Sequence, residues 1–449
     1  MWKTRFIQEI CLVETSSEKG GVLLLQKVIF NIGLRLRSPE IIKKYKFLKE
    51  SEKWDLNTLE NYQLEQLKKI VNIAYNKSEF YKKKFMEVGV TPNDIVTLED
   101  IKKLPMIEKN ELLKMSKFIQ NDEGYRKLFY SETSGSTGEP LVFYRNSEWD
   151  AGHRAAQFRG YSWYGVNPWE RNGYFWGYSF DSKRKAKTII LDKLVNRFRL
   201  FSYTESDIKD FCNKLKKADY LEGYSSMIYE VAKVINKYSL GPFNLKMVKG
   251  TSEKIFDSYQ EESIKAFGKK IVSEYGAAET GIIAYECKYG NMHITMENVI
   301  VEEIDGEAIV TNLISESFPI IRYKLGDSIS LDETTKCKCG MNHKIIKEVL
   351  GRVGKVIYGK ENMYPSLTLY YIFKNLVLNH DLVLNYQATQ HVPGELIIDI
   401  EQKLKPEEKN KIDYECRIYF SSDVAVTINE SNFKRDFEGK QKDFISYID

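Results

Sequence analysis

Short apolar segments alternate with amphipathic segments from Phe129 to Gly276, and this alternation limits the chain to few architectures. The apolar segments have the length of buried strands, and the amphipathic ones repeat their apolar residues with the period of a helix. The expected strands cover 172–180, 220–224, 247–251 and 271–276, and the expected helices cover 149–164, 205–218, 225–238 and 255–267. Repeated strand–helix units predict an α/β domain with a largely parallel sheet, whose ligands bind beyond the carboxyl ends of the strands.

Other patterns flank this region. Residues 1 to about 120 carry helical periodicity, most clearly over 56–85, whereas 292–310 alternates as strands do and contains an Asp305-Gly306 hairpin signal. Two glycines and two basic residues mark a junction at 351–355. We therefore expect an α/β fold with a large multi-sheet domain over 1–350, including a helical lead-in over 1–120, and a small α+β domain over 356–449.

Composition excludes several classes of protein. The 449 residues carry a net charge of +4, from 67 basic and 63 acidic residues, which is too balanced to predict a nucleic-acid partner. No apolar run reaches the ~18–20 residues of a membrane span, and charges interrupt 2–13 too often for a signal peptide. Six cysteines in a chain of this length favour a cytoplasmic protein over a disulfide scaffold.

Residues 21–36 form a basic amphipathic pattern. Such a segment either docks on the rest of the protein or lies on a membrane surface, and we favour docking.

The stretch from Ser131 to Pro140 places small hydroxyl residues and two glycines between two expected strands. Free N–H groups in such a loop form a concavity for phosphate oxygens, and hydroxyl groups add donors to it. An ordinary turn is an equally good interpretation of this stretch taken alone. The Gly-Lys-Ser/Thr of a P-loop is absent, so a nucleoside triphosphatase of that kind is not expected.

Three further motifs lie at expected strand ends. Tyr275 and Glu279 lie in 274–281, where a tyrosine can stack on a base and a carboxylate can bind magnesium. Asp327 ends 321–327, and an aspartate at this position can accept both hydroxyls of a ribose. The third motif is 351–355. Each motif alone is also compatible with a common turn.

In this order and spacing the four stretches resemble the adenylate-forming superfamily of acyl-CoA synthetases, peptide-synthetase adenylation domains and luciferases. The resemblance covers about residues 57–449 and is nearest the phenylacetate-CoA ligase branch, including members associated with capsular polysaccharide biosynthesis. It implies that 133–140 is the phosphate loop, that 351–355 is a hinge between two domains, and that the chain is an ATP-dependent ligase.

The resemblance also implies roles for individual residues. Those expected to hold the ATP phosphates are Ser134, Gly135, Ser136, Thr137 and Gly138. Those expected around the adenine and AMP are Ser252, Glu253, Tyr275, Gly276, Ala278 and Thr280. Glu279 is expected to bind Mg²⁺, Asp327 to bind the ribose beside Arg352, and Lys440 to reach the α-phosphate, with Lys434 or Lys442 as alternatives. Ala278 departs from the family, which usually has Thr or Ser at this position to contact the AMP phosphate. Thr280 would supply that hydroxyl only if the loop shifts.

The expected reaction joins a small-molecule carboxylic acid to ATP as an acyl-adenylate and then passes the acyl group to CoA. An amine of a sugar or amino acid is the alternative acceptor. A nucleotide-binding module without turnover is the alternative of a different class. The sequence leaves the acid, the acceptor and the oligomeric state open.

Four residues predict a metal site: Cys287, His293, Cys337 and Cys339. Thiolates and imidazole are the usual ligands of structural zinc, and four of them complete a tetrahedron. The same spacing resembles a zinc site in the nearest branch. His343 is a competing ligand, and a set of buried free thiols is the alternative to a zinc-binding insertion at 287–343.

Aromatic residues at 174–178 and 220–224 lie where this branch binds its organic acid, although an aromatic core strand explains them equally well. His153 and His391 are assigned no role.

Overall fold

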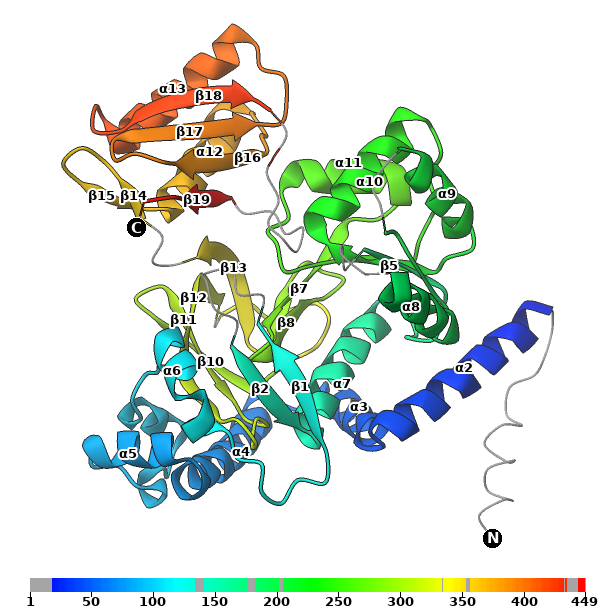
Figure 1. The fold of residues 1–449 in the computed structure, drawn as a ribbon, viewed down its shortest axis with the longest axis vertical. Helices are drawn as coiled ribbons and strands as arrows, with labels where there is room; N and C mark the ends of the chain where they lie inside the picture. Colours follow the sequence, from blue (N-terminus) through cyan, green and yellow to red (C-terminus); the bar gives the residue numbers. More distant parts are fainter. Residues whose placement is uncertain are drawn as a thin grey trace.

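A mixed eleven-stranded sheet forms the centre of the large domain in this computed structural model (Figure 1). The structure describes residues 18–133, 141–175, 182–201, 205–332, 334–352, 356–431, 433 and 443–448. The strand order is β10-β11-β12-β13-β9-β8-β7-β6-β5-β3-β4. Their bounds are β3 (Asn172–Phe175), β4 (Arg197–Arg199), β5 (Tyr220–Tyr224), β6 (Met247–Thr251), β7 (Ile271–Ala277), β8 (Gly281–Glu286), β9 (Met292–Ile294), β10 (Val299–Ile304), β11 (Glu307–Asn312), β12 (Ile320–Asp332) and β13 (Ile345–Arg352).

The sheet is parallel in only one half, which is the half formed by the strand–helix units for which a largely parallel sheet was predicted. Strands β4, β3, β5, β6 and β7 pair in parallel, and every pairing from β7–β8 to β10–β11 is antiparallel. The pairing changes from parallel to antiparallel at β7. Helices connect the strands before β7, whereas short turns connect many of those after it, and adjacent strands joined by a short turn pair antiparallel. The expected hairpin at Asp305-Gly306 is confirmed, with both residues at positive φ between β10 and β11.

Helices cover both faces of the parallel half. The helices α9 (Glu205–Leu215), α10 (Ser225–Lys237) and α11 (Asp257–Phe267) pack on one face through an apolar cluster that includes Leu221 and Val248. The other face packs against α7 (Ser147–Trp163), with Tyr161 against Tyr220. Between β3 and β4 the chain forms a further helix, α8 (Ser182–Leu194).

The helical lead-in is confirmed for the described residues. It comprises α2 (Glu18–Arg37), α3 (Glu40–Ser51), α4 (Leu56–Lys77), α5 (Glu79–Glu87) and α6 (Lys109–Ile119), with 3₁₀ turns at Pro92–Asp94 and Leu98–Lys103. Side-chain caps set the helix starts, since Asp55 accepts from the Thr58 N–H at 2.7 Å and Ser78 accepts from the Tyr81 N–H at 3.3 Å.

Helix α2 docks through its carboxyl-terminal part, as predicted. Phe30 and Leu34 pack against the core beneath α7, and Arg37 pairs with the buried Asp150 at 2.8 Å. Its other side leaves Leu25, Ile32 and Leu36 exposed. None of the helices in the described part of the chain has the length and apolar composition needed to cross a bilayer.

The small domain is a separate α+β unit (Figure 1). Its four-stranded sheet has the order β18-β17-β16-β19 and is covered by two helices. The bounds are β14 (Val356–Tyr358), β15 (Met363–Pro365), α12 (Leu367–His380), β16 (Tyr386–Gln390), β17 (Glu395–Ile400), α13 (Pro406–Phe420), β18 (Ala425–Glu430) and β19 (Phe444–Ser446). The α+β composition expected for this part of the chain is confirmed, whereas the short strands β14, β15 and β19 were not predicted.

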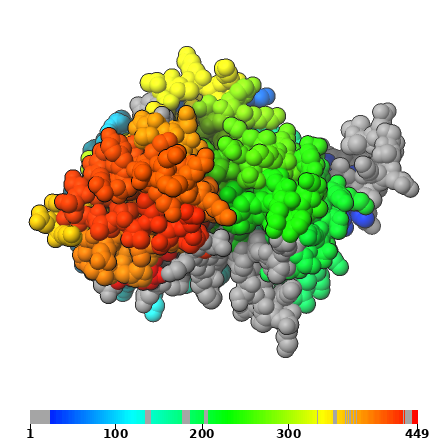
Figure 2. Space-filling model, turned by 90° about the horizontal axis from the view of Figure 1, so that it is seen from above, coloured from blue at the N-terminus to red at the C-terminus, as the bar shows by residue number. Residues whose placement is uncertain are grey.

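The two domains contact each other along α10 and α11. Figure 2 shows the small domain lying against this region of the large one. The rings of Phe256 and Tyr386 lie 5.9 Å apart, Ser258 donates to Asn385, and Lys233 pairs with Glu401. These contacts fix one relative arrangement of the domains in this structure.

Candidate functional site

Residues from separate strands meet at the candidate nucleotide site. The Tyr275 hydroxyl, on β7, donates a hydrogen bond of 2.9 Å to Asp327 Oδ2, on β12. Three strands separate β7 from β12 in the sheet order, so this bond requires the sheet to coil strongly. Two residues that the sequence analysis placed around one nucleotide are therefore neighbours.

Glu279 lies in the turn between β7 and β8. It is 7% exposed, and its Oε1 accepts a 3.1 Å hydrogen bond from the Tyr323 hydroxyl on β12. Among the described residues no cation forms an ion pair with Glu279. A buried carboxylate without a cationic partner is costly, and such groups commonly bind metal ions.

Glycines allow the β7–β8 turn to close tightly. A Cβ on Gly276 would lie 2.2 Å from the Gly281 carbonyl oxygen, so only glycine fits there. Gly281 has a φ of +78°, and a Cβ on it would lie 3.6 Å from His153 Nδ1, an atom that is buried and has no hydrogen-bond partner within the described residues. Sequence reasoning missed His153 because a single histidine on a helix carries no local signal.

Thr280 and Ala278 flank Glu279. Thr280 is buried, its carbonyl accepts a 3.1 Å hydrogen bond from Asn312, and its hydroxyl has no partner in the described structure. Ala278 packs against the main core. This anchoring holds the turn in place, so a shift that exposes the Thr280 hydroxyl must break the Asn312 bond.

Two other predicted residues lie at the end of β6. Ser252 adopts a φ of +65°, which is unusual for a residue with a side chain. Glu253 Oε2 accepts a 2.8 Å hydrogen bond from the Ser226 N–H, at the start of α10. Glu253 therefore caps that helix, and β6 and β7 end side by side.

The predicted phosphate loop connects two strands, as expected. Strands β1 (Leu128–Glu132) and β2 (Val142–Asn146) form an antiparallel hairpin, and Thr133 and Leu141 close its end by hydrogen bonds of 3.0 and 2.9 Å. The loop residues themselves, Ser134 to Gly138, lie outside the described residues. So do Lys440, its alternatives Lys434 and Lys442, and 353–355 of the junction. Arg352 is described by its backbone, which pairs with Asp327.

The four predicted metal ligands converge. Their ligand atoms all lie within 4.8 Å of one another. Cys287 Sγ and Cys337 Sγ are 3.6 Å apart, and Cys339 Sγ is 3.2 Å from His293 Nε2. These separations fit a tetrahedral ion with bonds of about 2.3 Å to sulfur.

A hydrogen-bond contact and burial keep the His293 ring in the orientation and protonation state that a metal ligand needs. Its Nδ1 lies 3.2 Å from the His343 carbonyl oxygen, which turns Nε2 toward the thiols. Burial lowers the pKa of His293 to about 4, so the ring stays neutral near pH 7. His343, the competing ligand, instead places its Nε2 2.9 Å from the carboxylate of Glu297.

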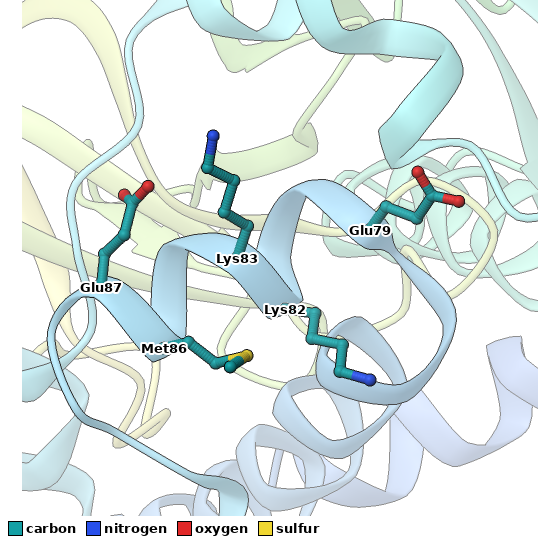
Figure 3. A pocket seen from close by; sticks show the side chains of 5 residues that line it. All are labelled: Glu79, Lys82, Lys83, Met86 and Glu87. Atoms are coloured by element: carbon teal, nitrogen blue, oxygen red, sulfur yellow. The ribbon is translucent and has the colours of Figure 1, made fainter.

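A surface hollow of about 450 Å³ lies along α5, lined by Glu79, Lys82, Lys83, Met86 and Glu87 (Figure 3). All of its lining comes from one helix of the lead-in, and none of the predicted site residues borders it. We assign it no role.

Known proteins resemble this chain in sequence and in fold. No family model matches it. It is 26% identical to Protein CapK of Staphylococcus aureus over 329 residues, which cover 68% of this chain and 70% of that protein. It is 22% identical to the phenylacetate-coenzyme A ligase of Thermus thermophilus over 68% of this chain and 73% of that enzyme. A shorter match, 34% over 90 residues, is to the phenylacetate-coenzyme A ligase of Pseudomonas putida and covers 19% of this chain and 20% of that enzyme.

A solved structure of 2-hydroxyisobutyryl-CoA ligase in its postadenylation state superposes with a TM-score of 0.69, covering 89% of this chain and 92% of that one at 16% identity. The structure of the same ligase in its thioesterification state superposes with a lower TM-score, 0.56. The arrangement of the two domains is thus nearer to the postadenylation state. The chain is thus similar in sequence to CapK and to phenylacetate-coenzyme A ligases, and in fold to 2-hydroxyisobutyryl-CoA ligase.

Proposed function

We propose that this protein is an ATP-dependent carboxylate ligase that forms an acyl-adenylate and then transfers the acyl group to CoA. The observation that carries the proposal is the contact between Tyr275 and Asp327, which supports a nucleotide-binding site built from β7 and β12. The phenylacetate-CoA ligases among the relatives support the choice of reaction.

In this proposal each group of site residues binds a different part of the nucleotide. Tyr275 and Gly276 border the adenine, with Ser252 and Glu253 at the neighbouring strand end, and Asp327 accepts the ribose hydroxyls. Ser134 to Gly138 bind the phosphates through N–H and hydroxyl donors. Lys440 approaches the α-phosphate as the acid attacks, and its charge offsets the negative charge that develops on the phosphoryl oxygens.

Glu279 would hold Mg²⁺, and its burial without a cationic partner among the described residues fits that role. The ion would supply charge neutralisation at the phosphates. The residues Cys287, His293, Cys337 and Cys339 would hold a structural Zn²⁺, and their convergence supports this assignment.

An amide ligase is the second candidate. The match to CapK, at 26% identity over 329 residues, favours this candidate, whose acceptor is an amine of a sugar or amino acid in capsular polysaccharide biosynthesis. A protein that binds the nucleotide without catalysing a reaction remains the alternative that is not an enzyme. It is suggested by Ala278, which lacks the hydroxyl that the family usually has at this position.

The test is ATP–pyrophosphate exchange with a broad panel of carboxylic acids. We expect exchange that depends on one class of acid. If none of the acids supports exchange although ATP still binds, the result contradicts the ligase and favours the binding module. Once an acid is found, adding CoA or amines and measuring the product mass separates the thioester ligase from the amide ligase.

A further inference from the structure

A pocket of about 460 Å³ lies at the edge of the parallel half of the sheet, beside β4. It is bordered by α2, α8, α9 and the residues around β4. Five basic side chains and one acidic side chain line it: Arg171, Lys193, Arg197, Arg199 and Lys214, with Asp192. Such an excess of positive charge in a concave site favours an anionic ligand.

Three of these cations have no carboxylate partner. Arg171, Lys193 and Lys214 form no ion pair within the described structure, and Arg171 Nε is buried without a hydrogen-bond acceptor there. The guanidinium of Arg171 stacks on the Phe198 ring at 4.9 Å, which holds it in the pocket wall. A buried donor without an acceptor costs stability, which a bound anion would restore.

The other two cations are fixed by their neighbours. Asp192 holds Arg199 through two hydrogen bonds of 2.9 and 3.1 Å. Arg197 donates a 2.7 Å hydrogen bond to Glu222 and one of 3.0 Å to Asn172. The pocket is therefore rigid on its sheet side, and its unpaired cations come from the surrounding helices and from Arg171.

A row of buried charges continues from this pocket toward the candidate nucleotide site. Glu222 is 3.2 Å from Lys249, and Lys249 is 2.9 Å from Glu274, the residue before Tyr275. The row crosses from β4 to β7, four strand spacings or about 19 Å. An anion in the pocket would thus lie far from the reacting centre, at the distance expected for the remote end of an extended molecule.

We propose that this pocket binds a phosphate group of the acceptor, the molecule that receives the acyl group. The proposal rests on the proposed function for the identity of the ligand. Arginine and lysine are the side chains that bind phosphate, and the pocket presents both. CoA has this chemistry, and its pantetheine arm separates its phosphates from its thiol by the length that a distance of about 19 Å requires. Glucosamine 6-phosphate carries a phosphate but is too short to span that distance.

The test compares ligands with and without phosphate by isothermal titration calorimetry. CoA is paired with pantetheine, and glucosamine 6-phosphate with glucosamine. The variant is Lys193→Gln with Lys214→Gln, because both lysines are exposed and neither forms an ion pair that would be broken. Lys217→Gln, which is also exposed and lies two residues beyond the end of α9 but outside the pocket, is the control. Arg171→Gln is a second variant.

We expect one phosphate-bearing ligand to bind the wild type and to bind the double variant about tenfold or more weakly, since contacts to charged groups are lost. Its phosphate-free counterpart should bind both proteins alike, and the control should match the wild type. CoA should be the ligand that shows the effect, and an effect with glucosamine 6-phosphate but not with CoA contradicts the proposal.

Equal affinities in the wild type and in both variants overturn the proposal, as does the absence of binding by both phosphate-bearing ligands at about 1 mM. ATP is titrated in parallel and should bind every variant equally. Failure of the wild type to bind ATP counts against the proposed ligase, whereas loss of the phosphate effect alone counts only against the pocket.

Discussion

Replacing Asp327 with alanine tests the centre of the proposed nucleotide site. In the proposed complex both ribose hydroxyls donate to this carboxylate. Each hydrogen bond to a charged group contributes about 1.5 kcal/mol at the low end, so the loss of two costs about 3 kcal/mol. Since a factor of ten corresponds to about 1.4 kcal/mol, the KM for ATP should rise by about 150-fold.

Tyr275→Phe tests how the carboxylate is held in place. The substitution removes the hydroxyl that donates to Asp327 at 2.9 Å but keeps the ring beside the expected adenine. The loss of one hydrogen bond of about 1 kcal/mol predicts an approximately fivefold rise in the KM for ATP. Because the two side chains touch, the double variant should lose less than the sum of the single effects.

The assay is acid-dependent ATP–pyrophosphate exchange at varied ATP. Asp332→Ala is the matched control, because this aspartate lies on the same strand, at the end of β12, but accepts hydrogen bonds from the turn at Thr334 and Thr335. It should leave the KM for ATP unchanged. If Asp327→Ala behaves like this control in a folded protein, Asp327 does not bind the ribose and the proposed site is wrong.

Three further outcomes are expected. Purified protein should carry about one equivalent of zinc by metal analysis and lose it in the Cys337→Ser, Cys339→Ser variant; wild type without zinc contradicts the site. Lys440→Ala should slow exchange by about 10²-fold or more while Lys434→Ala stays near wild type, and equal rates would reject Lys440. Glu297 is fully buried and its pKa is held below the usual range by Arg159 and His343, against the cost of burial. Its stabilising effect should therefore be present above the unfolded pKa of about 4.3 and decline as the pH falls below it, as chemical denaturation would show. Glu297→Gln should cost about 3–5 kcal/mol at neutral pH, and an unchanged denaturation midpoint would refute this.

Local signals predicted most elements correctly because their causes lie within a few residues. The start of α4 depends on the Asp55 cap, and the β10–β11 hairpin depends on two consecutive residues at positive φ, Asp305 and Gly306. The same holds for α7, α10 and the strands β5 and β6, whose apolar patterns are strong. The four metal ligands were also identified correctly as a spatial group, since Cys-x-Cys brings two sulfurs together locally.

Features that depend on remote partners were missed. The strands β14, β15 and β19 are each three residues long and carry too little pattern to be recognised. The antiparallel pairings of β8, β9, β12 and β13 were not predicted, because strand direction there is decided by which connections are short. The buried row through Glu222 and Lys249 was also missed, since each charge sits alone within an otherwise apolar strand.

By itself the sequence determined which residues carry chemistry and in what order, because glycines, hydroxyls, carboxylates and thiols have properties that do not depend on the fold. Only the tertiary structure decided which of them meet: Tyr275 with Asp327, Glu279 with Tyr323, and Cys287 with Cys337. These pairs are 44 to 52 residues apart in the chain. Their contact follows from sheet order and coiling, which are set by packing across the whole domain rather than by any local segment.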